Sequence, residues 1–278
     1  MSYSKIYLVL FVFLTFTGAL FAQKNIVILH TNDSHSRIEP VSLTDNSAPN
    51  MGGVVRRASY IDQIRLNNEN VLLFDSGDFL QGTPYFNLFK GKVEIEAMNL
   101  MRYDVATIGN HEFDYGLDVL EKVVRKANFP FISSNYVFDG TQLNGFIKPY
   151  VIIKKDGVKI GVLAVNIQPQ GLIAEQLYKG IKFLQPYKIA SDLATDLKEN
   201  KNCDIVICIS HLGIGNDLIL AKESRNIDII LGGHSHTFMK EPEFVENMDG
   251  KKVMIHQTNG RGVYVGKIDV ELEKVRRK

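Results

Sequence analysis

Histidine, aspartate and asparagine residues recur in this sequence directly after short apolar runs. Five of the seven histidines stand at such points, and carboxylates accompany them. Imidazole nitrogens and carboxylate oxygens are good ligands for divalent transition metals, so the pattern is typical of a metal centre. The residues that we predict to bind metal are Asp33, His35, Asp78, Asn110, His211, His234 and His236.

The spacing of these residues favours a centre that holds two ions. Asp33 and His35 are two residues apart, and in an extended backbone such residues point to the same side. His234 and His236 do the same if their turn stays extended. Two ions about 3.5–4 Å apart need a bridging ligand. A carboxylate such as Asp78 suits that role.

Each of these motifs is weak when it is taken alone. A single histidine after a strand is more often structural, and Asp-x-His is frequent by chance. The whole set in one chain favours the metal centre. His30 and His256 fall outside the set, and we expect them to be structural. Asp204 and Asp228 precede apolar runs, and we expect them to be solvated caps at the opposite end of the sheet.

The elements that must position these residues alternate between strand and helix. Short apolar runs predict buried strands at Ile26–Leu29, Val71–Phe74, Val105–Ile108, Phe131–Ser133, Ile160–Val165, Ile205–Ile209 and Ile229–Leu231. Helical spacing predicts helices at Val54–Leu66, Val93–Met101, Leu117–Lys126 and Tyr187–Leu197. This alternation indicates an α/β fold, in which the sheet gathers its polar site at the carboxyl ends of the strands.

Two segments depart from strict alternation. Val151–Lys159, with its Asp156-Gly157 turn, and the stretch Lys252–Leu272 read as antiparallel strands, so we expect mixed sheets. The longest predicted loop covers about residues 37–51. No linker or repeat divides the chain, which predicts one domain over residues 25–278.

The first 22 residues have the layout of a secretory signal. Lys5 precedes the apolar run Ile6–Phe16, and small residues lead to Ala22 before the polar Gln23. We therefore expect residues 1–22 to direct export to the periplasm or the extracellular space. The alternative is an uncleaved N-terminal anchor, which would give the protein its membrane contact.

The charge of the chain indicates the class of its substrate, and the positions of its cysteines exclude a disulfide between them. The formal net charge of the whole chain is +1, and no basic run is present. Affinity for a nucleic-acid polymer comes mostly from clustered Lys and Arg, so a small substrate is the better prediction. Cys203 and Cys208 lie five residues apart in what reads as one strand, about 16 Å at 3.3 Å per residue, and cannot bridge each other.

With these motifs in place, the sequence resembles the calcineurin-like metallophosphoesterase superfamily. The shared motifs are Asp33-Ser34-His35, Gly77-Asp78, Gly109-Asn110-His111-Glu112, His211 and Gly233-His234-Ser235-His236. Within it, the chain is similar to the catalytic domain of the 5′-nucleotidase and UDP-sugar hydrolase family, through the segments Leu29–Asp33, Gly109–Gly116 and Phe131–Asn135. The resemblance implies a four-layer α/β/β/α sandwich with a dinuclear metal site at the strand edges.

The resemblance also implies a role for each motif residue. The first ion would be held by Asp33, His35, Asp78 and His236, and the second by Asp78, Asn110, His211 and His234. Asp78 would bridge them. The ions could be Zn, Mn, Fe, Co or Ni, because this ligand set accepts all of them.

Catalytic roles follow from the same matching positions. His111 would face the substrate phosphate together with Asn110, and Asp114 would hold the His111 ring in orientation. A hydroxide on the metals would attack phosphorus, while protonated His111 stabilises charge and protonates the leaving oxygen. Glu112 and Asn135 match family positions too, Asn135 as a weaker candidate for substrate binding and Glu112 as a possible structural residue.

The resemblance leads to a 5′-nucleotidase-like phosphomonoesterase, with a 2′,3′-cyclic nucleotide phosphodiesterase or a UDP-sugar pyrophosphatase as alternatives. Full-length family members carry a C-terminal domain that holds the nucleoside, and this sequence ends at Lys278. We therefore expect either a phosphoesterase that works alone with an open cleft or a catalytic subunit whose specificity domain is a separate polypeptide. A non-catalytic metal-binding module is the alternative of another class.

Overall fold

Two six-stranded sheets face each other in this protein, for which the computed structural model describes residues 24–272. The predicted signal segment, residues 1–22, lies outside the described residues. The first sheet has the order β14-β1-β2-β3-β4-β6, and the second β12-β13-β11-β10-β8-β7. The strands of the first sheet are β1 (Lys24–Thr31), β2 (Val71–Asp75), β3 (Val105–Ala106), β4 (Phe131–Ile132), β6 (Ile147–Lys148) and β14 (Gly266–Leu272). Those of the second are β7 (Tyr150–Lys155), β8 (Val158–Asn166), β10 (Ile205–His211), β11 (Ile229–Leu231), β12 (Glu243–Glu246) and β13 (Lys252–His256).

Both sheets are mixed, as the sequence predicted. In the first, β14 is the antiparallel strand, paired with β1, and the other pairs are parallel. In the second, β7 and β12 are antiparallel to their neighbours. The predicted hairpin around Asp156-Gly157 is β7 and β8. The two strands of the stretch Lys252–Leu272 each have an antiparallel partner, as predicted: β13 pairs with β12 and β14 with β1. They lie in different sheets, and β13 also runs parallel to β11. A short pair, β5 (Tyr136–Val137) and β9 (Lys182–Phe183), forms a separate two-stranded sheet.

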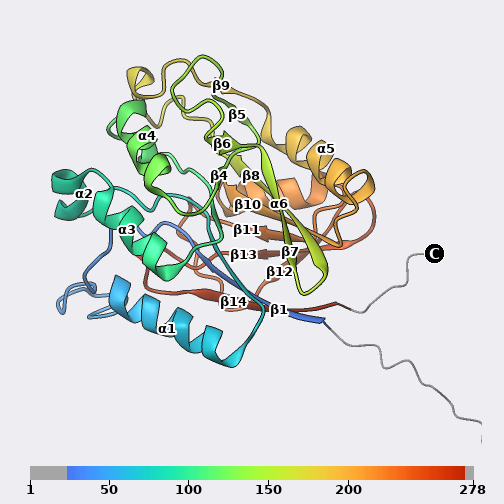
Figure 1. Cartoon of the computed structure of the whole chain (residues 1–278), viewed down its shortest axis with the longest axis horizontal. Helices are drawn as coiled ribbons and strands as arrows, with labels where there is room; N and C mark the ends of the chain where they lie inside the picture. The colour runs from blue at the N-terminus through green and yellow to red at the C-terminus, as the bar shows by residue number, and fades with distance from the viewer. Residues whose placement is uncertain (1–23, 273–278) are drawn as a thin grey trace, which may run out of the picture.

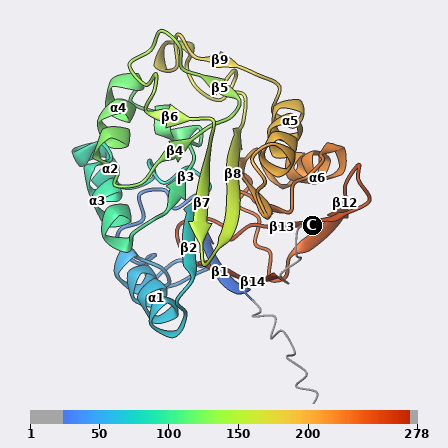
Figure 2. The ribbon, with the colours of Figure 1, turned by 45° about the vertical axis from the view of Figure 1, so that its right-hand side comes forward.

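Helices cover the outer faces of the two sheets (Figures 1 and 2). One side carries α1 (Val54–Asn67), α2 (Pro84–Phe89), α3 (Lys92–Met101) and α4 (Leu117–Lys126). The other carries α5 (Pro186–Glu199) and α6 (Ile214–Glu223), and two 3₁₀ turns, η1 (His111–Phe113) and η2 (Glu175–Leu177), lie in loops. All four predicted helices are present. The sequence missed α2, which has six residues, and α6.

Three apolar cores stabilise the fold: one between each sheet and its helices, and one between the two sheets. Along β1, Val27 and Leu29 pack toward the helices, whereas Ile26 and Ile28 pack against the second sheet. The alternation continues on β8, where Val162 faces the first sheet and Leu163 faces α5. Successive residues of a strand point to opposite faces, so runs that are apolar throughout can fill two layers at once. The predicted four-layer α/β/β/α sandwich is confirmed.

At the amino ends of the strands, two aspartates bind neighbouring backbone. The Asp204 carboxylate accepts a hydrogen bond from the Lys159 N–H at 2.8 Å, and Asp228 accepts one from the Val206 N–H at 2.6 Å. Asp228 also lies 2.7 Å from the Lys198 ammonium. These residues therefore connect adjacent strands at the end opposite the predicted site and are more than solvated caps.

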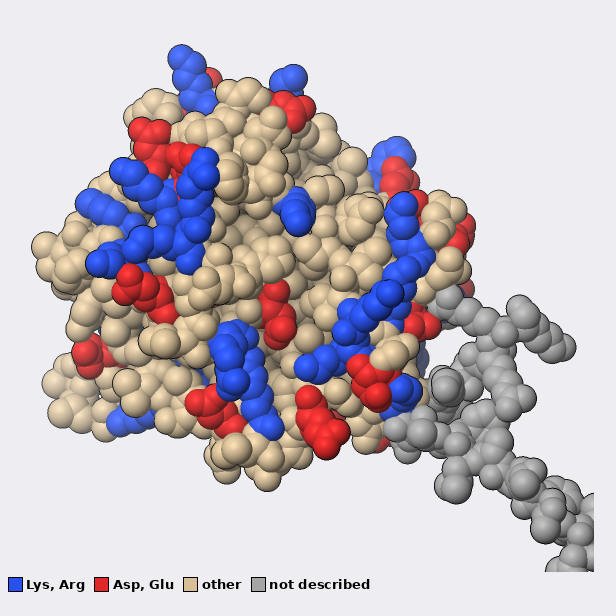
Figure 3. Space-filling view, in the orientation of Figure 1, with Lys and Arg blue, Asp and Glu red and all other residues tan. Residues whose placement is uncertain are grey.

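The surface carries both signs of charge. On the face in Figure 3, acidic and basic side chains are interspersed, and one group of Lys and Arg lies where Figure 1 places α4.

Cys203 and Cys208 are buried and do not bridge each other, as predicted. Among residues 24–272, no helix combines the length and the apolar character that crossing a membrane requires.

Candidate metal centre

The seven predicted metal-binding residues come from the carboxyl ends of five strands. Three of these strands belong to the first sheet: Asp33 and His35 follow β1, Asp78 follows β2, and Asn110 follows β3. The other two belong to the second sheet, where His211 is the last residue of β10, and His234 and His236 follow β11. The two sheets therefore contribute to one common edge, which is where α/β folds assemble their sites.

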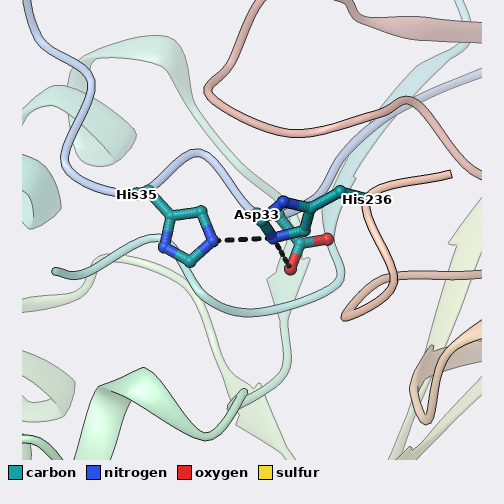
Figure 4. Close-up of side chains that lie close together, drawn as sticks. All are labelled: Asp33, His35 and His236. Carbon is teal, nitrogen blue, oxygen red and sulfur yellow. Dashed lines mark hydrogen bonds and ion pairs between the residues drawn. The ribbon is translucent and has the colours of Figure 1, made fainter. Parts of the chain in front are cut away.

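Asp33, His35 and His236 form the first cluster. One ligand atom from each lies within 4.8 Å of the others. The Nε2 atoms of the two histidines are 2.9 Å apart, and Oδ1 of Asp33 lies 3.4 Å from Nε2 of His236 (Figure 4). Asp33 is fully buried, and its carboxylate accepts hydrogen bonds from the Asn32 amide and the His234 N–H. These bonds aim the carboxylate at the two imidazoles.

Asp78, His211 and His234 form the second cluster. Oδ2 of Asp78 lies 3.2 Å from Nε2 of His211. Asn110 extends the cluster, because its Oδ1 lies 3.0 Å from Nδ1 of His234. His211 donates from Nδ1 to the Ser76 carbonyl oxygen at 2.6 Å, which leaves Nε2 as the ligating nitrogen of the neutral ring.

The electrostatics of His211 favour a positive charge at this point. Burial lowers the pKa of this fully buried imidazole, but the Asp78 and Asp33 carboxylates and the hydrogen bond to Ser76 together outweigh burial and raise the pKa to about 10. Nε2 faces Oδ2 of Asp78 at 3.2 Å and has no other partner among the described residues. A bound cation would replace the proton of His211 and take the same two ligands.

A third cluster connects the other two. His35 from the first cluster and Asp78 from the second lie with His111 within the same 4.8 Å limit. Two carboxylates, five imidazoles and the amide oxygen of Asn110 thus line one continuous site. This donor set suits divalent transition metals, so the clusters are able to hold metal ions.

The backbone at this site is not extended, contrary to the expectation from the sequence. Asp33 and His35 have φ angles of 49° and 46°, and His234 and His236 have 73° and 50°. Asp78 also has a positive φ, of 55°. Left-handed backbone costs a non-glycine residue about 1–3 kcal/mol and concentrates at functional sites. The side chains converge because tight turns aim them, not because alternate residues share a face.

Glycines give these turns the space that they need. A Cβ atom on Gly109 would lie 2.1 Å from Oδ1 of Asp78, and one on Gly233 would lie 2.9 Å from the Ser76 carbonyl oxygen. Neither separation is possible for a real side chain. Gly109 and Gly233 therefore let the loops after β3 and β11 each approach the loop after β2 closely.

His111 and Asp114 stand beside the third cluster. Nδ1 of His111 lies 3.0 Å from Oδ2 of Asp114, and the His111 N–H donates to Oδ1 of Asp78 at 2.8 Å. The Asp114 hydrogen bond, opposed by burial, raises the pKa of His111 to about 8. The two residues thus pair as predicted, with the ring of His111 half-buried at the site.

Glu112 has a structural position. Its buried carboxylate accepts hydrogen bonds from the N–H groups of Asp78 and Leu80, at 2.9 and 3.0 Å, and from that of Gly109. The loop after β2 and the loop after β3 are joined through this one side chain. His30 and His256 also pair with each other, at 2.8 Å between Nε2 and Nδ1, and so connect the two sheets.

Asn135 is fully buried, and its amide is engaged by the backbone of Asn166. Its Nδ2 donates to the Asn166 carbonyl oxygen and its Oδ1 accepts from the Asn166 N–H, both at 2.8 Å. A contact between Asn135 and substrate stays a prediction. Asn166, the last residue of β8, was not predicted from the sequence; its Nδ2 donates to Oγ1 of Thr107, which follows β3 of the first sheet, at 2.9 Å. The signal was present, because Asn166 ends an apolar run as the metal-site residues do.

Comparisons with known proteins agree with this geometry. The model of the calcineurin-like phosphoesterase family matches residues 26–238. Human 5′-nucleotidase is 32% identical over 275 residues, which are 90% of this chain and 47% of the relative. The snake venom 5′-nucleotidase of Crotalus adamanteus is also 32% identical, over 88% of this chain and 45% of the relative. The chain thus spans about half the length of the curated relatives it matches.

Solved structures give the same result. The 5′-nucleotidase precursor from Thermus thermophilus superposes with a TM-score of 0.81 at 32% identity, over 89% of this chain and 51% of that one. The NAD nucleotidase of Haemophilus influenzae superposes with a TM-score of 0.82 at 27% identity, over 90% of this chain and 53% of that one. The fold, the residue clusters and the matched motifs agree, and the chain belongs to the calcineurin-like phosphoesterase family of metal-dependent phosphoric ester hydrolases.

Proposed function

We propose that this protein is an exported phosphoesterase that hydrolyses phosphate esters of nucleotides with two divalent metal ions, in the manner of a 5′-nucleotidase. One observation carries the proposal. The clusters around Asp33 and around His211 are joined by a third cluster that contains His111, a residue outside the proposed ligand set. A site of this form places a potential proton donor directly beside a pair of cations.

The proposed ligands follow the clusters. Asp33, His35, Asp78 and His236 would hold one ion, and Asp78, Asn110, His211 and His234 would hold the other. Asp78 is shared because its carboxylate belongs to two of the three clusters. When bound, such ions lower the pKa of a coordinated water and neutralise the phosphoryl oxygens.

The chain's own residues do the remaining work. Asn110 and His111 bind the phosphate, and His111 passes a proton from Nε2 to the leaving oxygen. Asp114 accepts the hydrogen bond from Nδ1 and so fixes the ring and favours its protonated form. General acid catalysis of this kind contributes about 10²–10⁴-fold to the rate.

The substrate class rests on the named relatives. Several are 5′-nucleotidases, which favours a phosphomonoesterase. One structural relative is an NAD nucleotidase, which favours a pyrophosphate substrate as the second candidate. A separate polypeptide that supplies nucleoside specificity is part of the proposal.

A substrate screen tests the proposal. The protein would be loaded with Zn, Mn, Fe, Co or Ni in turn and assayed with AMP, p-nitrophenyl phosphate, its bis-ester, 2′,3′-cyclic AMP, UDP-glucose and NAD. We expect turnover of AMP and p-nitrophenyl phosphate that chelation abolishes. Two bound ions without turnover of any ester would contradict the enzyme and favour a metal-binding module.

Dependence on a partner protein and export from the cell are each tested by a separate experiment. The screen would be repeated with any protein that co-purifies, and a large gain in nucleotide selectivity is expected if a partner supplies specificity. For export, the full chain and a chain without residues 1–22 would be compared by cell fractionation in the native host. Equal retention of both in the cytoplasm would contradict export.

A further inference from the structure

A cavity of about 430 Å³ lies between the first turns of α1 and the loop that precedes β14. Its lining includes Arg56, Arg57, Tyr60, Val263 and Tyr264, and none of the described residues that line it is Asp or Glu. Small-molecule sites commonly measure about 300–1,000 Å³. The cavity thus has the size for an organic ligand and walls that combine positive charge with apolar surface.

Arg57 is the unusual residue in this cavity. Its side chain is only 8% exposed, and its Nε and Nη1 atoms are buried without a hydrogen-bond partner among the described residues. The positive charge of Arg57 lowers the pKa of Asp75, against the larger effect of burial, which raises it. The two side chains form no ion pair within residues 24–272. A buried positive charge without a paired anion is unfavourable. Nε and Nη1 are closed to the cavity, so an anion there would meet Arg57 through the part of its side chain that stays exposed and would balance its charge.

The neighbouring Arg56 provides a contrast. Its Nη1 donates to the carbonyl oxygen of Asn50, and its Nη2 lies 3.3 Å from Oδ1 of the same residue. The Arg56 guanidinium is therefore engaged within the protein, whereas Nε and Nη1 of Arg57 have no hydrogen-bond partner among the described residues. The position of the Arg57 side chain requires glycine at residue 262, because a Cβ there would lie 2.3 Å from Nη1 of Arg57.

The cavity is distinct from the metal centre, although one loop touches both. None of the seven proposed metal ligands lines it. Gly262 contacts Arg57, whereas Gly260, two residues earlier, lies against the His236 ring. The Arg261 N–H between them donates to the Asp33 carbonyl oxygen at 2.6 Å.

We propose that this cavity binds a small organic anion, an aryl or similarly flat group that carries a carboxylate or phosphate. The anionic group takes the guanidinium of Arg57, and the flat group packs against the tyrosine and valine side chains. Charge-assisted hydrogen bonds to arginine are directional and stronger than neutral ones. Arg57 therefore selects the anion, and the apolar walls select the group that bears it.

The test uses the full chain after chelation, so that no metal holds the anion. Benzoate, phenyl phosphate and neutral phenol are titrated at constant ionic strength, and the unfolding temperature is followed by differential scanning fluorimetry. We expect saturable stabilisation by both anions, at concentrations where phenol has no effect. Arg57→Gln should weaken anion binding about 10–100-fold, the equivalent of roughly 1.5–3 kcal/mol. The matched control Arg56→Gln should change it less than about 3-fold, because the Arg56 side chain is engaged by Asn50.

Four results would overturn the proposal. They are no saturable effect in the wild type, equal binding of phenol, equal affinity in Arg57→Gln, and binding that is lost with Asp78→Asn but kept in Arg57→Gln. If Arg57→Gln does not fold, Met51→Trp fills the cavity from its half-exposed rim without changing Arg57. Wild-type affinity in Met51→Trp would also refute the site. None of these readouts depends on turnover, so the outcome is independent of the proposed enzyme activity.

Discussion

Nδ1 of His111 lies 3.0 Å from the carboxylate of Asp114, three residues further along the chain. The short turn η1 brings the two together, because the Asp114 N–H donates to the His111 carbonyl oxygen. A carboxylate at Nδ1 fixes the tautomer and leaves Nε2 for the substrate. The pair therefore depends on local geometry that a single substitution can remove.

Replacement of Asp114 by Asn should lower kcat about 10–100-fold without loss of metal, since it removes an orienting group and no ligand. Steady-state kinetics on p-nitrophenyl phosphate and elemental analysis would be measured together. Asp118→Asn, in the first turn of α4, is the control and should behave as the wild type. Unchanged kcat in Asp114→Asn would show that the pair has no catalytic role.

Metal stoichiometry should separate the shared ligand from the unshared ones. His236→Ala should retain one of two ions, whereas Asp78→Ala should lose both or bind them at least 10-fold more weakly, because Asp78 contributes to two clusters. Inductively coupled plasma mass spectrometry after dialysis measures the content. His256→Gln is the control and should keep two ions. Equal loss in the Asp78 and His236 variants would argue against a bridging carboxylate.

The buried His30 should make the fold sensitive to acid. Burial, and then the charge of His256, lower the pKa of His30 from 6.5 to about 3. Between these values the unfolded chain binds a proton that the folded chain does not, so stability falls as the pH is lowered from 6.5 toward 3. This group alone contributes about 2 kcal/mol of loss between pH 6.5 and pH 5, at roughly 1.4 kcal/mol per pH unit.

Urea unfolding of the chelated protein at pH 7, 6 and 5 measures this loss. His30→Gln should reduce the acid slope by that amount. Ile28→Val, a buried substitution in the same strand, should lower stability by about 0.5–1.5 kcal/mol equally at every pH. Equal slopes for His30→Gln and the wild type would mean that His30 takes up its proton without unfolding.

Glu112 should matter for stability, because it joins two site loops through three backbone N–H groups. Glu112→Gln turns an amide N–H₂ toward these donors, and each buried group left unpaired costs about 1–3 kcal/mol. Chemical denaturation should show a loss in that range or above it. Glu121→Gln, on the surface of α4, should change stability by less than about 0.5 kcal/mol. A loss no larger than this in Glu112→Gln would contradict the structural role.

Most of the fold could be predicted because its central strands coincide with short apolar runs that have polar ends. The runs at β1, β8 and β10 fill two layers each, which leaves a strong signal in the sequence. The elements that were missed lack such a signal. Helix α2 is short and aromatic, and β12 is largely exposed, so neither carries the periodicity that prediction relies on.

The membership of the site could be predicted from residue type and strand context, but its local geometry could not. Asp33 and His35 adopt left-handed backbone without a glycine to mark it, because tertiary contacts hold the turn. The Arg57 cavity was also invisible, since it joins α1 to a loop about 200 residues later, and no short motif records that contact.

We propose that His111 acts on the substrate while the seven neighbouring residues hold the metal. The variant His111→Asn separates these two roles when kcat and metal content are measured on the same preparation. We expect a fall in kcat of about 10²–10⁴-fold with two ions per chain still bound. Loss of metal together with activity, or wild-type turnover without the imidazole, would contradict it.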